Sequence, residues 1–265
     1  MTLPGTSVRM PAAFLAHGSP MNAVEHNDYT EAWSAFGKSM QKPTAILAIS
    51  AHWYINALAV TAMKRPKTIH DFSGFPPQLS SFDYPAVGSP SLAARVADLL
   101  SPRDVVLDES EWGLDHGTWS VLCHVFPEAD VPVVQLSIDR TLNPADHVAI
   151  GRALAPLRDE GVLIIGSGNI VHNLGLIDWS ARGIGADWAQ RFDAQTQEIL
   201  TGENPGRVIE MMDLQDAQKA VPTPDHFLPI AFIAGLADAS GASLEVMTSG
   251  CEMGSLSMTS YALRD

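Results

Sequence analysis

Histidine is the residue type whose positions in this chain most strongly suggest chemistry. His17 directly follows the apolar run AAFLA, His52 lies just beyond ILAIS, and His172 follows VLIIGSGN. Each run is typical of a buried strand, and ligand sites in open α/β sheets gather at the carboxyl edge of the strands. The spacing therefore predicts three imidazoles at one edge of a sheet.

Two further histidines lie in local contexts that suit the same site. Thr223 can cap a helix and Pro224 suits its first position, so His226 is expected in the first turn. The positive end of the helix dipole disfavours imidazolium there and favours the neutral, metal-binding ring. His116 lies in a turn-like stretch, LDHGTW, whose Gly117 permits a close approach to a ligand.

Several histidines at one edge suit a divalent first-row metal, because imidazole binds zinc, iron, copper and nickel. A single buried histidine is more often a hydrogen-bonded core residue, so the prediction depends on the five positions together. The other four histidines are weaker candidates. We expect His26 and His147 to be solvated and His124 to be structural. Only His70 is kept as a residue that could contact the substrate or another site residue.

Other catalytic motifs are missing from the sequence or have the wrong spacing. It contains no GxGxxG after a strand, no Walker loop, no CxxC and no HExxH, and the stretch GSGN at 166–169 has the spacing of neither a phosphate loop nor a nucleophile elbow. Ser19, beside His17, could be a nucleophile, but Ser19-Pro20 is interpreted more simply as a tight turn. A serine hydrolase is therefore disfavoured.

The composition disfavours some classes of binding partner and favours one cellular compartment. The 265 residues include 16 basic and 30 acidic ones, a formal charge of −14, which disfavours nucleic acid and anionic lipid surfaces as partners. Cys123 and Cys251 are too few for a disulfide framework, which fits a reducing compartment. No window approaches the roughly 18 to 20 apolar residues that span a bilayer, and the first ten residues lack a secretory apolar core. We therefore predict a cytoplasmic protein with no membrane partner.

The pattern of apolar runs and caps predicts an α/β fold. It has a central, mainly parallel or mixed sheet flanked by helices, with the metal site at the carboxyl edge of the strands, and it forms one catalytic domain over 1–265. Strands are expected at 12–16, 45–50, 58–62, 131–138, 162–166 and 244–248. Helices are expected over 143–159, from 90 to about 100, around Trp188 and Phe192, and from 224 onward.

One stretch, 63–87, interrupts this alternation. It is rich in Pro, Gly, Ser and aromatic residues and includes the strings IHDF and GFPP. A loop of this length without regular structure is uncommon unless it is functional. It is interpreted either as a lid over the site or as a packed surface loop.

The motifs, taken in order, resemble those of a known family. From Phe14 to about Met258, nearly end to end, the chain is similar to the DOPA-type extradiol ring-opening dioxygenases, which belong to the class III extradiol superfamily. The strings that carry the resemblance are FLAHGSPMN, SAHW, HDFSGFP, WGLDHGTW, PVVQLSID, SGNIVHNL, PTPDHFLP and EMGSLSM.

The resemblance implies roles for the five histidines. His17, His52 and His226 match the family's metal ligands, His172 matches a fourth ligand or a base, and His116 matches a catalytic histidine beside the metal. The wider superfamily supplies a glutamate as third ligand, whereas this chain has His226 at that position. The implied metal is Fe(II) for activity, and Zn(II) is the alternative occupant because a site of histidines also suits zinc.

The family's reaction opens a catechol ring outside the diol and inserts both atoms of O2. The resemblance implies a small aromatic diol, DOPA-like or caffeate-like, and dioxygen as partners. A base that takes the hydroxyl proton is also needed, and His172 or His116 would fill that role. Aromatic and imidazole side chains are expected to line the substrate pocket: Trp53, His70, Phe72, Phe75 and Trp119.

Two other functions remain open on the same residues. One is a zinc-dependent hydrolase or lyase, in which the histidines hold a zinc ion that generates hydroxide. The other is a non-catalytic, metal-binding member of the same fold. The presence of both His116 and His172 favours an enzyme, since a binding protein needs no proton-transfer groups beside the metal. The sequence does not indicate the oligomeric state.

Overall fold

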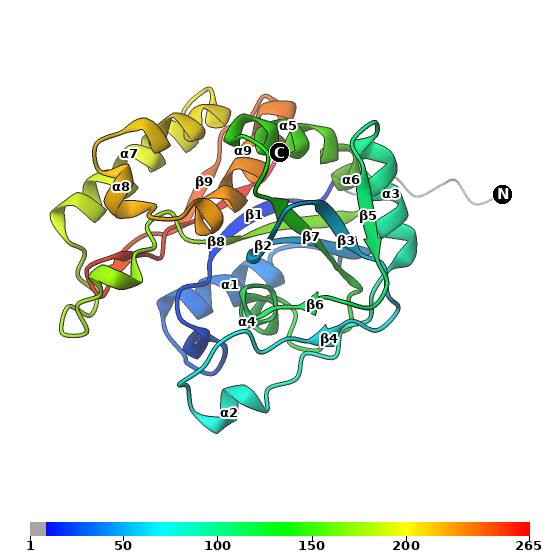
Figure 1. Ribbon diagram of the computed structural model, residues 1–265, viewed down its shortest axis with the longest axis horizontal. Helices are drawn as coiled ribbons and strands as arrows, with labels where there is room; N and C mark the ends of the chain where they lie inside the picture. Colours follow the sequence, from blue (N-terminus) through cyan, green and yellow to red (C-terminus); the bar gives the residue numbers. More distant parts are fainter. Residues whose placement is uncertain (1–8) are drawn as a thin grey trace.

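The computed structural model describes residues 9–265 and has an eight-stranded mixed sheet at its centre (Figure 1). The strands follow the order β5-β3-β7-β2-β8-β1-β12-β9. Their bounds are β1 Ala12–Ala16, β2 Ala45–Ile55, β3 Leu58–Thr61, β5 Val105–Asp108, β7 Val133–Asp139, β8 Val162–Gly168, β9 Glu245–Thr248 and β12 Ser260–Leu263. Two small sheets pair β4 (Lys67–Thr68) with β6 (Gly113–Leu114) and β10 (Cys251–Glu252) with β11 (Leu256–Ser257).

The four central strands, β7, β2, β8 and β1, are parallel. Outside them, β3 pairs with β7 and β12 pairs with β1 in antiparallel fashion. The central strands read as nearly unbroken apolar runs because helices cover both of their faces. The predicted mainly parallel or mixed sheet is therefore confirmed.

Helices on the two faces of the sheet form two separate cores. Phe14 and Leu47 point to the face covered by α9, where Phe232 packs against them. Leu15 and Ile46 point to the opposite face, where Trp33 of α1 lies. This alternation follows from the two-residue period of a strand. The helices of the first core are α3 (Pro90–Leu100), α5 (Pro144–Leu154), α6 (Pro156–Asp159), α7 (Asp187–Leu200) and α9 (Leu228–Ser240), and those of the second are α1 (Asp28–Lys38) and α4 (His116–Val125).

Short helical segments complete the fold. The α-helical ones are α2 (Pro77–Ser80) and α8 (Ala217–Ala220), and the 3-10 segments are η1 (Pro20–Ala23), η2 (Leu174–Leu176), η3 (Pro205–Asp213) and η4 (Pro224–His226). No helix in the described part of the chain, 9–265, is both long and apolar enough to cross a membrane.

Several predicted bounds were correct and others need correction. The helix from Pro90 to Leu100 and the helix that carries Trp188 and Phe192 are confirmed. The predicted helix over 143–159 is in fact two helices, because Pro156 lacks an N–H and breaks the hydrogen-bond ladder after α5. The predicted loop over 63–87 contains β4 and α2.

Two of the corrected elements carry site histidines. Strand β2 continues to Ile55, so His52 lies within the strand and not beyond it. At His52 the pairing of β2 with β7 is irregular, because its register shifts between Ile49 and Tyr54. His226 ends the 3-10 turn η4, which precedes α9, and Thr223 makes no side-chain capping hydrogen bond there.

Candidate active site

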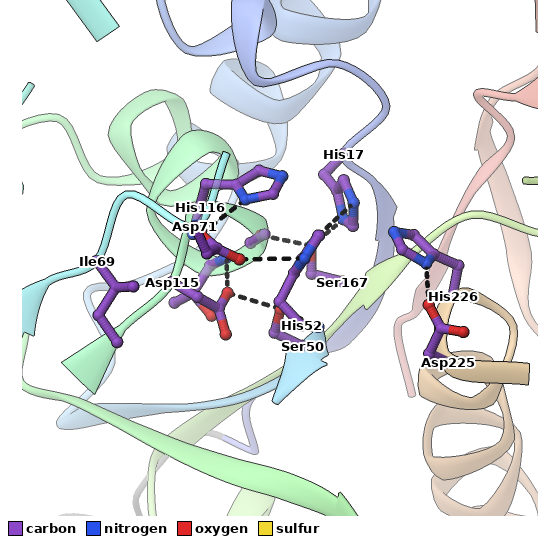
Figure 2. Close-up of polar contacts among 12 residues, drawn as sticks. His17, Ser50, His52, Ile69, Asp71, Asp115, His116, Ser167, Asp225 and His226 are labelled. Carbon is purple, nitrogen blue, oxygen red and sulfur yellow. Dashed lines mark hydrogen bonds and ion pairs between the residues drawn. The ribbon is translucent and has the colours of Figure 1, made fainter. Parts of the chain in front are cut away.

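Four histidines from separate elements converge at one edge of the central sheet (Figure 2). His17 follows β1, His52 lies on β2, His116 is the first residue of α4 and His226 ends η4. The ring centroids of His17, His52 and His226 are separated by 5.1, 5.3 and 5.0 Å in the pairs 17–52, 17–226 and 52–226. The site therefore lies at the predicted edge of the sheet.

The chain leaves β1 through a tight turn that fixes His17. The His17 backbone N–H donates to the carbonyl of Gly168, 3.2 Å away, which ties the ends of β1 and β8 together. Gly18 has a φ of +60°, in the left-handed region that favours glycine, and a Cβ there would meet the Met258 side chain. The imidazole of His17 is consequently buried at the end of its strand.

Helix α4 brings His116 next to His52. Asp115 caps the helix by accepting from the Thr118 N–H at 3.1 Å, so His116 begins a helix and does not lie in the predicted turn. A Cβ on Gly117 would lie 2.8 Å from His52 Cδ2, so the helix start packs directly against β2. The His52 and His116 ring centroids are 3.9 Å apart.

Each of the four rings is held through its Nδ1 atom by a group outside the cluster. His17 Nδ1 lies 2.9 Å from Ser167 Oγ, whose own hydroxyl donates to the Gly117 carbonyl. The other three rings contact carboxylates: His52 Nδ1 and His116 Nδ1 lie 3.1 and 2.8 Å from Asp71, and His226 Nδ1 lies 2.5 Å from Asp225. Metal-binding histidines are usually anchored in this way, through the nitrogen that does not face the metal.

The Nε2 atoms are the nitrogens left to face one another. His17 Nε2 and His52 Nε2 are 3.3 Å apart. Two nitrogens bound to one ion at about 2.1 Å and at a tetrahedral angle would be about 3.4 Å apart. The donor set therefore fits a divalent metal between the two rings. One ligand atom from each of His17, His52 and His116 also falls within a mutual 4.8 Å, which makes His116 a competing third position.

His172 lies beside the four clustered histidines and is stacked on one of them. Its backbone N–H donates to the Ala220 carbonyl at 2.9 Å, and its ring is stacked on His226 with centroids 3.5 Å apart and an interplanar angle of 2°. All five histidines singled out in the sequence are thus brought together.

The comparisons with known proteins identify the family. Residues 11–264 match the family described as the catalytic LigB subunit of aromatic ring-opening dioxygenase. The chain belongs to this family of aromatic ring-opening dioxygenases. The resemblance noted in the sequence motifs is thereby confirmed.

Several relatives of this dioxygenase cover almost the whole chain. A 4,5-DOPA dioxygenase extradiol of Escherichia coli K12 is 45% identical over 97% of this chain and 96% of its own length. One of Beta vulgaris is 39% identical over 94% of both chains. A crystal structure of an uncharacterized protein from Escherichia coli K12 matches with a TM-score of 0.85 and 41% identity, covering 97% of this chain and 100% of that one.

Most of the dioxygenase's site histidines are held neutral. Burial lowers the pKa of His17 well below its ordinary value, with the neighbouring histidines adding to the effect. Burial also lowers the pKa of His226 to about 4 and that of His172 to about 3. His52 differs: burial lowers its pKa, but the hydrogen bond to Asp71 and nearby carboxylates outweigh burial and raise it. Neutral imidazoles are the form that binds a metal or accepts a proton.

These shifts predict that the metal-free protein loses stability on acidification. Since the folded-state pKa values of His17, His172 and His226 lie below the unfolded value of 6.5, the unfolded chain binds more protons below that pH. The raised pKa of His52 acts in the opposite direction and offsets part of this loss. We expect the free energy of unfolding to fall by at least about 2 kcal/mol from pH 7 to pH 5.

Denaturant unfolding of the metal-free protein at several pH values measures this loss. His172→Gln should flatten the slope, because it removes one of the groups whose pKa changes on folding. An unfolding free energy that stays constant over this pH range would contradict the burial-driven shifts.

Of the predicted pocket residues, two are buried tryptophans and one is a phenylalanine in contact with a site histidine. Trp53 and Trp119 are buried: Trp53 is stacked on Trp112 at 5.5 Å between centroids, and Trp119 Nε1 donates to the Ile69 carbonyl at 2.8 Å. Phe72 instead places its ring edge-on to His116, 5.5 Å between centroids. Of these side chains, Phe72 has the most direct contact with a site histidine.

Two other predicted residues lie further out. His70 is exposed, and its Nε2 lies 2.8 Å from the Phe82 carbonyl. Phe75 packs edge-on against Phe72, 5.4 Å between centroids. Among the remaining histidines, His147 was predicted to be solvated, which is wrong: its side chain is buried on α5 against Phe232.

Sequence reasoning missed the residues that anchor the rings. Asp71, Asp225 and Ser167 belong to the strings HDF, PDH and GSG. Nothing in the spacing of Asp71 and Ser167 links them to a particular imidazole, whereas Asp225 is the neighbour of the ring that it anchors, His226. Burial would raise the pKa of Asp71, but hydrogen bonds from His116 and His52 outweigh it and hold that pKa well below its ordinary value. Asp71 is therefore a carboxylate that can only accept hydrogen bonds.

Proposed function

We propose that this dioxygenase opens the ring of a catechol outside the diol with insertion of both atoms of O2, using Fe(II) held by His17, His52 and His226. The observation that carries the proposal is the arrangement of these three rings, each anchored through Nδ1. Rings bound through Nε2 to one ion at tetrahedral angles would have centroids about 5.2 Å apart. The three observed separations are 5.1, 5.3 and 5.0 Å.

The same criterion argues against His116 and His172 as ligands. The His116 centroid is 3.9 Å from that of His52 and 5.7 Å from that of His17, so it does not share the even spacing of the other three. His172 is stacked at 3.5 Å on His226, too close for both rings to point their nitrogens at one ion. We assign His172 and His116 to proton transfer.

When bound, Fe(II) supplies Lewis acidity toward the diol oxygens and redox capacity toward dioxygen. The protein side chains transfer protons and contact the substrate. His172 is neutral, with its pKa lowered by burial to about 3, and accepts the proton of a substrate hydroxyl. His116, whose Nδ1 is fixed on Asp71, presents its Nε2 to the same space and moves a proton as the ring opens. Phe72 packs against that ring and offers an apolar face to the substrate.

The names of the relatives support a substrate class for this chain. The proteins of Escherichia coli and Beta vulgaris that align over nearly the whole chain are each named 4,5-DOPA dioxygenase extradiol. We propose a DOPA-like or caffeate-like catechol for this chain, with the catalytic domain spanning 1–265 as predicted. Zinc is the alternative occupant, since a set of histidines also suits zinc hydrolysis chemistry.

Anaerobic reconstitution of the metal-free protein with Fe(II) or, separately, with Zn(II) tests the proposal. Oxygen uptake and absorbance are then followed with DOPA, caffeate and protocatechuate. We expect uptake of one O2 per ring and a new yellow chromophore in the iron sample alone. Bound iron without oxygen uptake on any of the three catechols would contradict the proposal.

A further inference from the structure

Asp71 contacts two site histidines at once, although it comes from the 63–87 segment and not from the sheet. Its Oδ1 accepts from His116 Nδ1 at 2.8 Å and from the His116 backbone N–H at 3.0 Å. Its Oδ2 lies 3.1 Å from His52 Nδ1. The carboxylate thus lies between the first residue of α4 and strand β2, as Figure 2 shows.

The residues around Asp71 are hydrogen-bonded to the same helix and to β6, the strand that precedes it. The Ile69 N–H donates to the Leu114 carbonyl at 2.7 Å, and the Ile69 carbonyl accepts from Trp119 Nε1 at 2.8 Å. Phe72 lies edge-on to His116. Residues 69–72 are therefore packed against the start of α4. Within this stretch, the Asp71 carboxylate is the group that hydrogen-bonds to the site histidines.

We propose that Asp71 is a positioning residue that sets the tautomers of His52 and His116 together and couples metal binding to the ordering of the 63–87 segment. The inference rests on the proposed function, in which His52 is a metal ligand. A carboxylate only accepts hydrogen bonds, so each ring nitrogen that faces it carries the hydrogen and each Nε2 is left bare. The Asp71 side chain thereby sets the tautomer of a metal ligand, His52, and of a proton-transfer group, His116.

The coupling acts in both directions. A metal that holds the His52 ring in place keeps His52 Nδ1 aimed at Asp71, which favours the docked segment. The docked segment in turn favours the ring orientation and tautomer that bind metal, and by linkage the two effects are equal in free energy. Because Phe72 and Phe75 belong to the same segment, docking also places aromatic side chains beside the site.

Asp71→Asn separates this role from simple packing. The two bonds from His116 to Oδ1 fix the amide oxygen there, so the amide NH2 faces His52 Nδ1. A donor at that place favours the His52 tautomer with hydrogen on Nε2, where the metal would bind. We expect Zn(II) affinity, measured by titration against a chelator, to fall by about 10- to 100-fold. The visible spectrum of the Co(II)-loaded protein should change as well.

Segment ordering is measured by trypsin cleavage at the exposed Lys64 and Lys67. Zn(II) should slow this cleavage by about fivefold or more in the wild type and much less in Asp71→Asn. Asp83→Asn is the matched control, because Asp83 lies exposed in the same segment and bonds only Thr68 Oγ1 among the contacts described. It should behave like the wild type in both measurements.

The outcomes separate the two proposals. Asp71→Glu retains an acceptor-only carboxylate and should bind Zn(II) better than Asp71→Asn; equal losses in the two variants would assign the effect to packing and overturn the inference. Wild-type affinity, Co(II) spectrum and metal protection in Asp71→Asn would overturn it too, while leaving the proposed function intact. A wild-type protein that binds neither Zn(II) nor Co(II) would overturn the metal centre itself, and the inference with it.

Discussion

His17→Ala is expected to abolish metal retention and, with it, ring cleavage. His17 is buried, its Nδ1 is held by Ser167 and its Nε2 lies 3.3 Å from that of His52, so its replacement removes one of the two facing nitrogens of the metal site. Loss of an anchoring partner alone costs about 10- to 100-fold in metal affinity. Loss of the ligand should exceed that range. Metal content after dialysis and oxygen uptake with Fe(II) are the measurements.

The control for this variant is His26→Ala. His26 is exposed and is in none of the ring contacts described for the cluster, so its replacement should leave metal content and rate unchanged. Cavity formation could lower the stability of His17→Ala, and far-UV circular dichroism checks that the variant is folded. A folded His17→Ala protein with full metal content would refute the assigned ligand set.

His116→Ala should retain the metal and lose rate. If His17, His52 and His226 hold the metal, removal of His116 leaves three ligands in place but removes a proton-transfer group. The expected loss in kcat is about 10²- to 10⁴-fold, the usual contribution of a general acid or base. Metal content by elemental analysis and steady-state oxygen uptake with a catechol measure the two effects separately.

The paired variant His226→Ala makes this test decisive. Among the described residues, one ligand atom from each of His17, His52 and His116 lies within 4.8 Å of the other two, so a metal held by those three is the competing arrangement. In that case His116→Ala would lose the metal and His226→Ala would keep it. The even spacing of the His17, His52 and His226 rings predicts the reverse.

The sequence by itself determined which histidines to consider. His17 and His172 lie just beyond apolar runs that form β1 and β8, and parallel neighbours must end at one edge of the sheet. His52 was placed correctly at that edge even though its strand is longer than predicted, because the site depends on the sheet edge and not on the last residue of the strand. The family motifs then implied roles for all five candidates.

Only the tertiary structure showed how those histidines are arranged around the site. The stacking of His172 on His226 and the even spacing of the His17, His52 and His226 rings depend on side-chain orientations, which the periodicity of a sequence does not determine. Asp71 was overlooked for the same reason: its bonds to His52 and His116 span 19 and 45 positions and exist only because 69–72 docks on α4. Sequence periodicity specifies which face of an element is buried, whereas contacts of about 3 Å between side chains distant in sequence are set by how the folded elements pack.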